Sequence, residues 1–193
     1  MDVHPEKNGA GLIGCILTGD PNAFERFIRE HERLVFHVVC RMVTNAADRE
    51  DLCQDVFLKI YKNLAGFRRE SKISTWVARI AYNTCLNHLK KKKPTLLEDC
   101  LDAGGSDGWA DTAAAPDEQA ESGETTRRLQ EELARLALPY RTALTLYHLE
   151  DMPVTDIARV MDLPEGTVKS LLFRARRILK NRLAFAYEGE LCR

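Results

Sequence analysis

Residues 152–183 read MPVTDIARVMDLPEGTVKSLLFRARRILKNRL. Apolar residues recur every three or four positions on both sides of residues 162–164, which predicts two short amphipathic helices. Between them Asp162 to Pro164 leaves room only for a tight turn, and Pro164 suits the first turn of the next helix. The expected inward residues are Val154, Ile157, Ala158 and Met161, then Val168, Leu171 or Leu172, Ala175, Ile178 or Leu179, and Leu183.

The second of these helices is rich in Arg and Lys and has few acidic residues near them. Two short helices joined by a tight turn, the second one basic, are typical of a helix-turn-helix that places its second helix in a DNA major groove. A plain helical hairpin with a solvated basic face is the weaker alternative. Two more helices precede the motif, at 126–136 and, opened by Pro139, through Leu149.

The first half of the chain also has helical periodicity. A helix that starts at Asp20–Pro21 and stops near Asn45 is predicted, followed by helices at 47–64 and 75–92, the last closed by Pro94. Residues 66–74 break the pattern and predict a loop. The expected inward residues are Phe24, Phe27, Ile28, His31, Leu34, Val35, Val38, Val39 and Met42, then Leu52, Val56, Phe57, Ile60, Tyr61 and Leu64, then Trp76, Val77, Ile80, Ala81, Thr84 and Leu89.

Charge divides the 193 residues into three parts. Residues 1–95 carry a net charge of +5, residues 96–126 carry -9 with no basic residue, and residues 127–193 carry +3. The acidic stretch is rich in Gly and has almost no aliphatic periodicity, which is typical of a flexible linker. We therefore expect an all-α fold with two small helical domains, at 1–95 and 127–193, joined by the acidic linker 96–126.

Several classes of protein are excluded by what the sequence lacks. No apolar run is long enough for a membrane span and no secretory signal is found, so we expect a cytoplasmic protein with no membrane insertion. There is no phosphate-binding glycine loop or nucleophile motif, and the five histidines do not cluster, so no catalytic residue, cofactor or enzyme activity is expected. A metal site at His37, Cys40 and Cys53 lacks a fourth ligand, so we expect no metal and interpret the cysteines as small apolar residues.

Two separate motif blocks then point to one family. Residues 48–68, DREDLCQDVFLKIYKNLAGFR, with 74–93, STWVARIAYNTCLNHLKKKK, resemble the second conserved region of extracytoplasmic-function (ECF) RNA polymerase sigma factors. Residues 138–179 resemble the fourth region. The resemblance implies two all-helical domains that bind core RNA polymerase, through its clamp helices and flap, and give it promoter specificity. It also implies an anti-sigma factor as an inhibitory partner.

The resemblance assigns roles to individual residues of the first domain. It implies that the polar helix face with Asp51, Gln54, Asp55 and Lys59 docks on the polymerase clamp helices; an ordinary solvated face is the alternative. It implies that the 66–74 loop and the helix after it read and melt the -10 element, with a flipped base in a loop pocket. The residues expected to meet this DNA are Phe67, Arg68, Arg69, Lys72, Trp76, Arg79, Asn83, Asn87, Lys90 and Lys91, with Lys92 and Lys93 beside them.

In the second domain the resemblance implies that the recognition helix reads the -35 element. Lys169, Ser170, Phe173 and Arg174 are expected at base edges and Thr167 and Arg176 at phosphates, and Arg177 is also expected to bind this DNA. Leu171 departs from the family, which usually has Arg there, so the -35 preference or affinity is expected to differ.

Three questions stay open at this level. The acidic linker can thread the polymerase channels, act as a passive tether, or fold back on the basic domains and screen DNA binding. The C-terminal tail with Phe185 and Tyr187 can join an anti-sigma contact or be a frayed end. A stand-alone activator or repressor is the rival function, and it leaves Asn83, Asn87 and the lysine run unexplained.

Overall fold

The structure, a computed structural model, describes residues 5–92 and 124–191. Within these two ranges every regular element is a helix, so the expected all-α fold is confirmed. The expectations for residues 96–123, for Lys93 and Pro94, and for the Phe185 and Tyr187 side chains lie outside the described part. The first unit comprises α1 (Pro5–Leu17), α2 (Pro21–Met42), α3 (Ala46–Asn63), the 3-10 turn η1 (Leu64–Gly66) and α4 (Ile73–Lys92), and the second comprises α6 (Glu124–Ala134), α7 (Leu138–His148), α8 (Val154–Met161) and α9 (Glu165–Leu191).

Side-chain caps set the helix starts in the first unit. The Asp20 carboxylate accepts a hydrogen bond of 2.9 Å from the backbone N–H of Asn22, and Pro21 fills the first helical position, as the sequence predicts. Asn45 was expected to stop α2, and this is wrong. The helix already ends at Met42, and the Asn45 side chain instead accepts from the Ala47 N–H at 3.0 Å and caps the start of α3.

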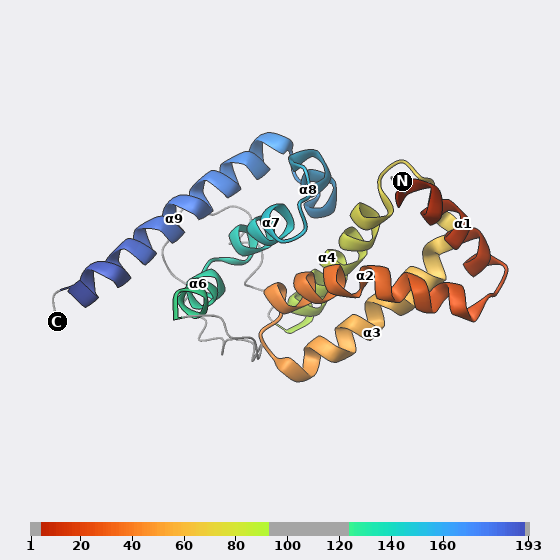
Figure 1. Cartoon of the computed structure of the whole chain (residues 1–193), viewed down its shortest axis with the longest axis horizontal. Helices are drawn as coiled ribbons and strands as arrows, with labels where there is room; N and C mark the ends of the chain where they lie inside the picture. The colour runs from red at the N-terminus through yellow and green to blue at the C-terminus, as the bar shows by residue number, and fades with distance from the viewer. Residues whose placement is uncertain (1–4, 93–123, 192–193) are drawn as a thin grey trace.

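The core of the first unit lies around α2, which packs against α1, α3 and α4 (Figure 1). Phe27, Val35, Val39, Val56 and Val77 are almost completely buried in it. Helix α1 was not predicted from the sequence, and its apolar residues Leu12, Ile13 and Ile16 are buried against the same core. Its glycines weaken the helical signal, because glycine disfavours helix interiors by about 1 kcal/mol relative to alanine.

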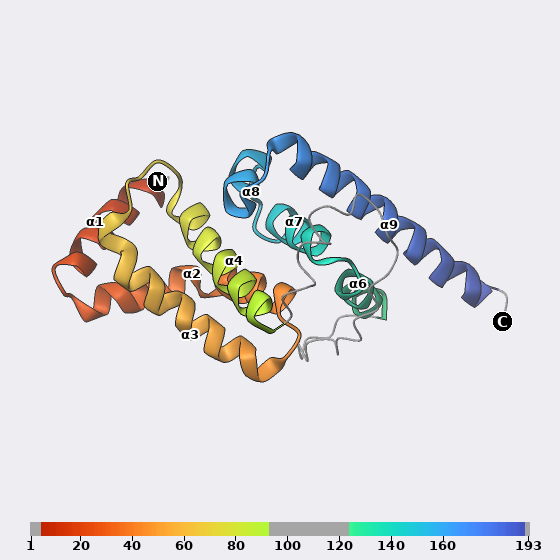
Figure 2. The ribbon, with the colours of Figure 1, turned by 180° about the vertical axis from the view of Figure 1, so that it is seen from behind.

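In the second unit α9 is the element against which α6, α7 and α8 pack (Figure 2). Val168, Leu172 and Ala175 form its buried side, with Ile157 of α8 and Leu146 of α7 also fully buried. Of the two candidates left open by the sequence, Leu172 is the buried residue, and Leu171 is only partly buried against the same core. The spacing of three and four residues in α9 therefore gives one apolar face and leaves the other to solvent.

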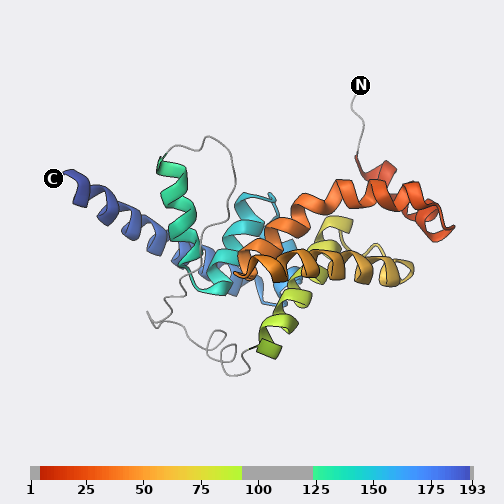
Figure 3. The same cartoon turned by 90° about the horizontal axis from the view of Figure 1, so that it is seen from below.

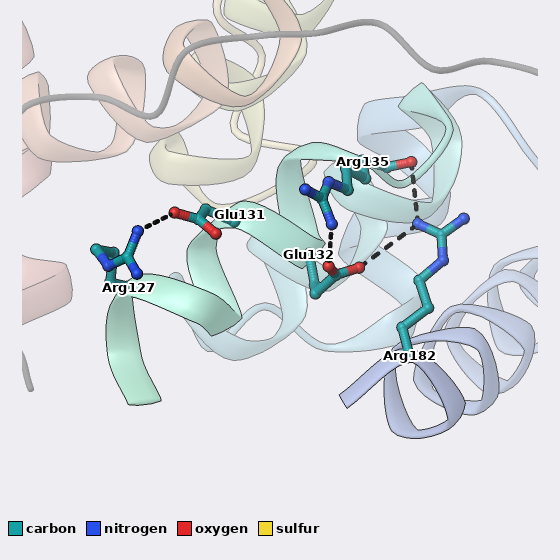
Figure 4. Close-up of polar contacts among 5 residues, drawn as sticks. All are labelled: Arg127, Glu131, Glu132, Arg135 and Arg182. Carbon is teal, nitrogen blue, oxygen red and sulfur yellow. Dashed lines mark hydrogen bonds and ion pairs between the residues drawn. The ribbon is translucent and has the colours of Figure 1, made fainter. Parts of the chain in front are cut away.

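Polar contacts fasten α6 to the C-terminal half of α9 (Figure 4). Arg182 donates to the Arg135 carbonyl at 3.3 Å and lies 4.0 Å from the Glu132 carboxylate, which also pairs with Arg135. Arg127 and Glu131 pair at 2.6 Å on the same helix. The helix α9 continues to Leu191.

The two units lie against each other. Helix α2 of the first unit contacts α7 of the second, and α4 contacts α8 (Figures 1 and 3). The chain thus brings residues more than 70 positions apart into one interface, which no local sequence pattern predicts.

Candidate nucleic-acid and polymerase interfaces

The exposed side of α9 holds all the residues expected at the -35 element. Thr167, Lys169, Ser170, Phe173, Arg174, Arg176 and Arg177 are all exposed. Phe173 has 66% of its surface accessible, more than any other large apolar residue of the described chain. A solvent-exposed aromatic ring beside four cations indicates a surface that binds a partner. Nucleic acid is a partner that suits both the ring and the cations.

Neighbouring elements fix some of these side chains. The Arg176 guanidinium lies over the Tyr147 ring, 5.0 Å from its centroid, and its Nη2 donates to His148 Nε2 at 3.2 Å. Helix α7 therefore orients this cation, which the sequence analysis did not anticipate. The Ser170 hydroxyl donates to the Gly166 carbonyl at 3.0 Å, so its oxygen lone pairs are the part left for a base or phosphate.

The turn of the helix-turn-helix depends on one unusual backbone conformation. Asp162 has φ 56° and ψ 46°, in the left-handed region that Asp and Asn tolerate better than most residues. The next residue, Leu163, closes the helix end by donating from its N–H to the Ala158 carbonyl at 3.0 Å. Helix α9 begins at Glu165, one residue later than the sequence suggested, and the Pro164 carbonyl accepts from the N–H groups of Thr167 and Val168.

On α4 the side chains expected to read the -10 element form one row. Arg79, Asn83 and Asn87 are four residues apart and all exposed, while Ala78, Ala81 and Cys85 are buried on the other side. Lys90 and Lys91 extend the row and are also exposed. Lys92 instead pairs with Asp48 of α3, so its ammonium group already has an acidic partner within the unit. The amide groups and cations of the row suit base edges and phosphates, respectively.

The loop before α4 holds the remaining -10 candidates. Arg68, Arg69 and Lys72 are exposed, and Arg69 has a positive φ of 57°. Phe67 and Trp76 are half-buried and pack against each other, with ring centroids 5.3 Å apart and planes tilted by 49°. The two aromatic residues therefore support the loop first, and only their outer faces remain for stacking on a base.

The expected docking face of α3 is exposed and only partly polar. Asp51, Gln54 and Asp55 are exposed, and Lys59 is exposed but donates from Nζ to Thr84 Oγ1 of α4 at 3.2 Å. Tyr61 was expected to point inward, and this is wrong, because it is 52% exposed. Leu58 on the same stretch is 56% exposed. Leu58 lies three residues after Asp55 and four residues after Gln54. This helical spacing could have shown from the sequence that Leu58 shares their face.

The buried titratable groups of the first unit do not form a metal site. Among the described residues, no group of three His, Cys, Asp or Glu side chains is placed to hold a metal ion. His37 pairs with Glu150 of the second unit instead of with cysteines. Burial raises the pKa of the Cys53 thiol to about 11 and that of the Cys85 thiol to about 12.

In the described ranges no helix has the length and apolar character of a membrane span.

Comparison with known proteins agrees with the two blocks. The Sigma-70 region 2 family model matches residues 27–95, and the Sigma-70, region 4 model matches residues 126–179. The ECF RNA polymerase sigma-E factor of Haemophilus influenzae is 34% identical over 180 residues, which cover 89% of this chain and 93% of that protein. The chain belongs to the ECF RNA polymerase sigma factor family.

Other sigma factors show the same likeness over nearly full length. The ECF sigma factor SigW of Bacillus subtilis is 29% identical over 176 residues, covering 89% of this chain and 94% of that one. Among solved structures, the sigma factor RpoE of Bartonella quintana, crystallised with the anti-sigma factor NepR, superposes with a TM-score of 0.67 at 20% identity, covering 83% and 96% of the two chains. The likeness in structure confirms the fold of this ECF sigma factor.

Proposed function

We propose that this ECF sigma factor binds core RNA polymerase and directs it to promoters whose -10 and -35 elements are read by α4 and α9. The observation that carries the proposal is that both expected reading surfaces, on two units of one chain, are exposed and carry cations beside amides or an aromatic ring. The protein would act in the cytoplasm, with domains at 1–95 and 127–193 joined by 96–126.

The first unit would bind the polymerase through α3. Asp51, Gln54, Asp55 and Lys59 would face the clamp helices, and the second unit would contact the flap. Charged docking surfaces mainly set orientation and encounter rate, so reversing a charge weakens binding more than neutralising it. We expect Asp51→Lys or Asp55→Lys to lower affinity for core polymerase more than Asp51→Asn or Asp55→Asn. Glu25→Lys on α2, outside the proposed face, is the matched control.

The two DNA surfaces would divide the reading of the promoter. Asn83 and Asn87 would read bases of the -10 element, with Arg68, Arg69, Lys72, Arg79, Lys90 and Lys91 at the backbone and Phe67 and Trp76 supporting an extruded base. Lys169, Ser170, Phe173 and Arg174 would read the -35 element, with Thr167, Arg176 and Arg177 at phosphates. The Leu171 position, usually Arg in the family, supplies core packing here, so this interface has one cation fewer.

Transcription with purified bacterial core polymerase on a genomic promoter library tests the proposal. Starts that depend on this protein and share a two-block upstream motif would support it, and Asn83→Ala with Asn87→Ala should change only the downstream block. If no start depends on the protein while it binds a palindromic duplex tightly by itself, a stand-alone regulator replaces the proposal.

An anti-sigma factor is the expected inhibitory partner. The structural neighbour RpoE was solved in complex with the anti-sigma factor NepR, which supports the same kind of control here. Co-purification of this protein with a partner that blocks the transcription above would test it, and full activity in extracts of the source cells without any inducing signal would count against it.

A further inference from the structure

The side chain of Arg176, on the exposed face of α9, is held by two residues at the C-terminal end of α7. Its guanidinium carbon lies 5.0 Å from the centroid of the Tyr147 ring. Its Nε and Nη2 atoms both approach Nε2 of His148, at 3.4 and 3.2 Å. Helices α7 and α9 pack against each other (Figure 2), so these contacts fix the guanidinium relative to both helices. We call the three residues the Arg176 cluster.

The Arg176 cluster is built outward from the core of the second unit. Tyr147 is half-buried and packs on that core, whereas His148 and Arg176 are exposed. The rings of Tyr147 and His148 meet edge to face, with centroids 4.9 Å apart and planes at 76°. This is a preferred geometry for aromatic pairs. The buried part of Tyr147 therefore gives a fixed base to a cation that itself is exposed to water.

Both partners hold the cation without neutralising it. Arginine has only donors, so His148 Nε2 must accept, which requires an uncharged imidazole with its proton on Nδ1. The tyrosine ring attracts a cation through its quadrupole and carries no charge. Arg182 on the same helix differs, because it lies 4.0 Å from the Glu132 carboxylate (Figure 4). The contacts of Arg176 thus leave its positive charge available to a further anion.

The place of Arg176 on α9 suits a phosphate better than a base. It lies seven residues beyond Lys169, which is two helical turns and about 10 Å further along the same face. A recognition helix contacts bases mainly with its N-terminal residues, so later positions approach the edge of the groove. Because Nε and Nη2 are turned to His148, the outer edge of the guanidinium with Nη1 is the part left for phosphate oxygens.

We propose that Tyr147 and His148 are positioning residues for DNA binding, which hold the Arg176 guanidinium in place for a phosphate beside the -35 element. The inference rests on the proposed function, because it presumes that α9 reads that element. An unrestrained arginine loses side-chain freedom when it binds, and a side chain already ordered in the free protein avoids part of that loss. The negative end of the α7 dipole adds to the attraction for the cation.

The tautomer of His148 tests the contact without any DNA. In full-length protein with isotope-labelled histidine at pH 8, the nitrogen resonances should show the proton of His148 on Nδ1. The resonance is assigned by its absence in His148→Gln. Arg176→Ala removes the donor, so the proton should then shift toward Nε2, since nothing requires a lone pair there. A wild-type His148 with its proton on Nε2 would overturn the contact.

The salt dependence of promoter binding tests the role in recognition. The probe is the duplex of a promoter whose start depends on this protein, bound by the full chain together with core polymerase. Arg176→Ala should weaken binding about tenfold and reduce the slope of log K against log salt by about 0.9, as expected for one lost phosphate contact. His148→Ala and Tyr147→Ala should each weaken binding about threefold. Wild-type affinity in Arg176→Ala would overturn the proposal.

A scrambled -35 block distinguishes a phosphate contact from a base contact. Arg176→Ala should lose the same factor in affinity on this duplex as on the intact one, because a phosphate contact carries no sequence information. A loss confined to the intact block would assign Arg176 to a base and overturn the phosphate contact.

Two comparisons separate positioning from a merely structural role. If His148 acts through Arg176, His148→Ala should have no further effect in the Arg176→Ala protein. His148→Gln can still accept from the guanidinium and Tyr147→Phe keeps the ring face, so both should bind within about 1.5-fold of the wild type. Leu149→Ala, an exposed substitution next to His148, is the matched control and should not change binding. A threefold loss for His148→Ala in the Arg176→Ala background would overturn positioning.

Failure of the proposed function gives a different result from failure of the Arg176 cluster. If no transcription start depends on the protein, the role of the cluster in promoter binding fails as well, while the His148 tautomer still shows whether the cluster forms. If starts do depend on the protein and His148→Ala binds the promoter like the wild type, the function stands and the positioning role alone is overturned.

Discussion

Truncation of two neighbouring residues of α9 to alanine should affect two different properties of the protein. Leu172 has 3% of its surface exposed and packs in the core of the second unit, whereas Phe173 has 66% exposed and touches little of the protein. The helix turns by 100° between them, so one side chain serves stability and the other faces a partner. Leu172→Ala should weaken folding, and Phe173→Ala should weaken promoter recognition while leaving the fold intact.

The magnitudes follow from burial. Leu172→Ala removes three buried carbons, worth about 2.4 kcal/mol at 0.8 kcal/mol each, and the cavity left behind brings the loss to about 3 kcal/mol. For a chain of this length that lowers Tm by roughly 6–12 °C. Phe173 is only one third buried, so its truncation loses about 0.8 kcal/mol of apolar contact, and the better helix propensity of alanine returns about 0.5 kcal/mol. The expected Tm change for Phe173→Ala is therefore about 1 °C.

Thermal melting followed by circular dichroism measures the Tm of each variant, and promoter-dependent transcription with core polymerase measures its promoter recognition. Phe173→Ala should lose at least fivefold in transcription from promoters that carry a -35 block. Lys62→Ala, an exposed substitution on α3 away from α9, is the control and should change neither. A Tm drop above about 4 °C in Phe173→Ala would refute the assignment of its ring to solvent, and full transcription would refute its contact with DNA.

The remaining predictions concern stability and reactivity. Burial lowers the pKa of His31, whose Nδ1–H donates to the Phe27 carbonyl, so its contribution to stability is complete above about pH 6.5 and falls as the pH drops below that unfolded-state value. The urea midpoint should therefore fall between pH 7.5 and pH 5, and less in His31→Phe; equal losses would contradict this. Asp20→Ala should cost about 1 kcal/mol by calorimetry, since it removes the α2 cap, and no loss would rule the cap out. Iodoacetamide at pH 8 should label exposed Cys15 well before Cys53 and Cys85, whose raised pKa values keep them protonated. Mass spectrometry of the digest measures the order of labelling, and the opposite order would contradict this prediction.

The sequence by itself determined the parts of this protein that depend on neighbours along the chain. Apolar spacing predicted the described helices other than α1, Asp20 and Pro21 predicted the start of α2, and the tight turn at 162–164 predicted the helix-turn-helix. The rows of exposed Arg, Lys and Asn on α4 and α9 follow from the same periodicity, because a helical repeat that buries one face exposes the other. The family also followed from residue order alone.

Local patterns failed where the outcome depends on contacts between distant segments. Glycines concealed α1, which is stabilised by packing on the first core, and Tyr61 kept the inward spacing yet lies exposed. Only the tertiary structure could pair His37 with Glu150, set Arg176 on Tyr147, and bring Asp162 to Arg79. Each of these contacts joins residues from segments that lie far apart along the chain, and their energies depend on burial and on distances that the order of residues does not contain.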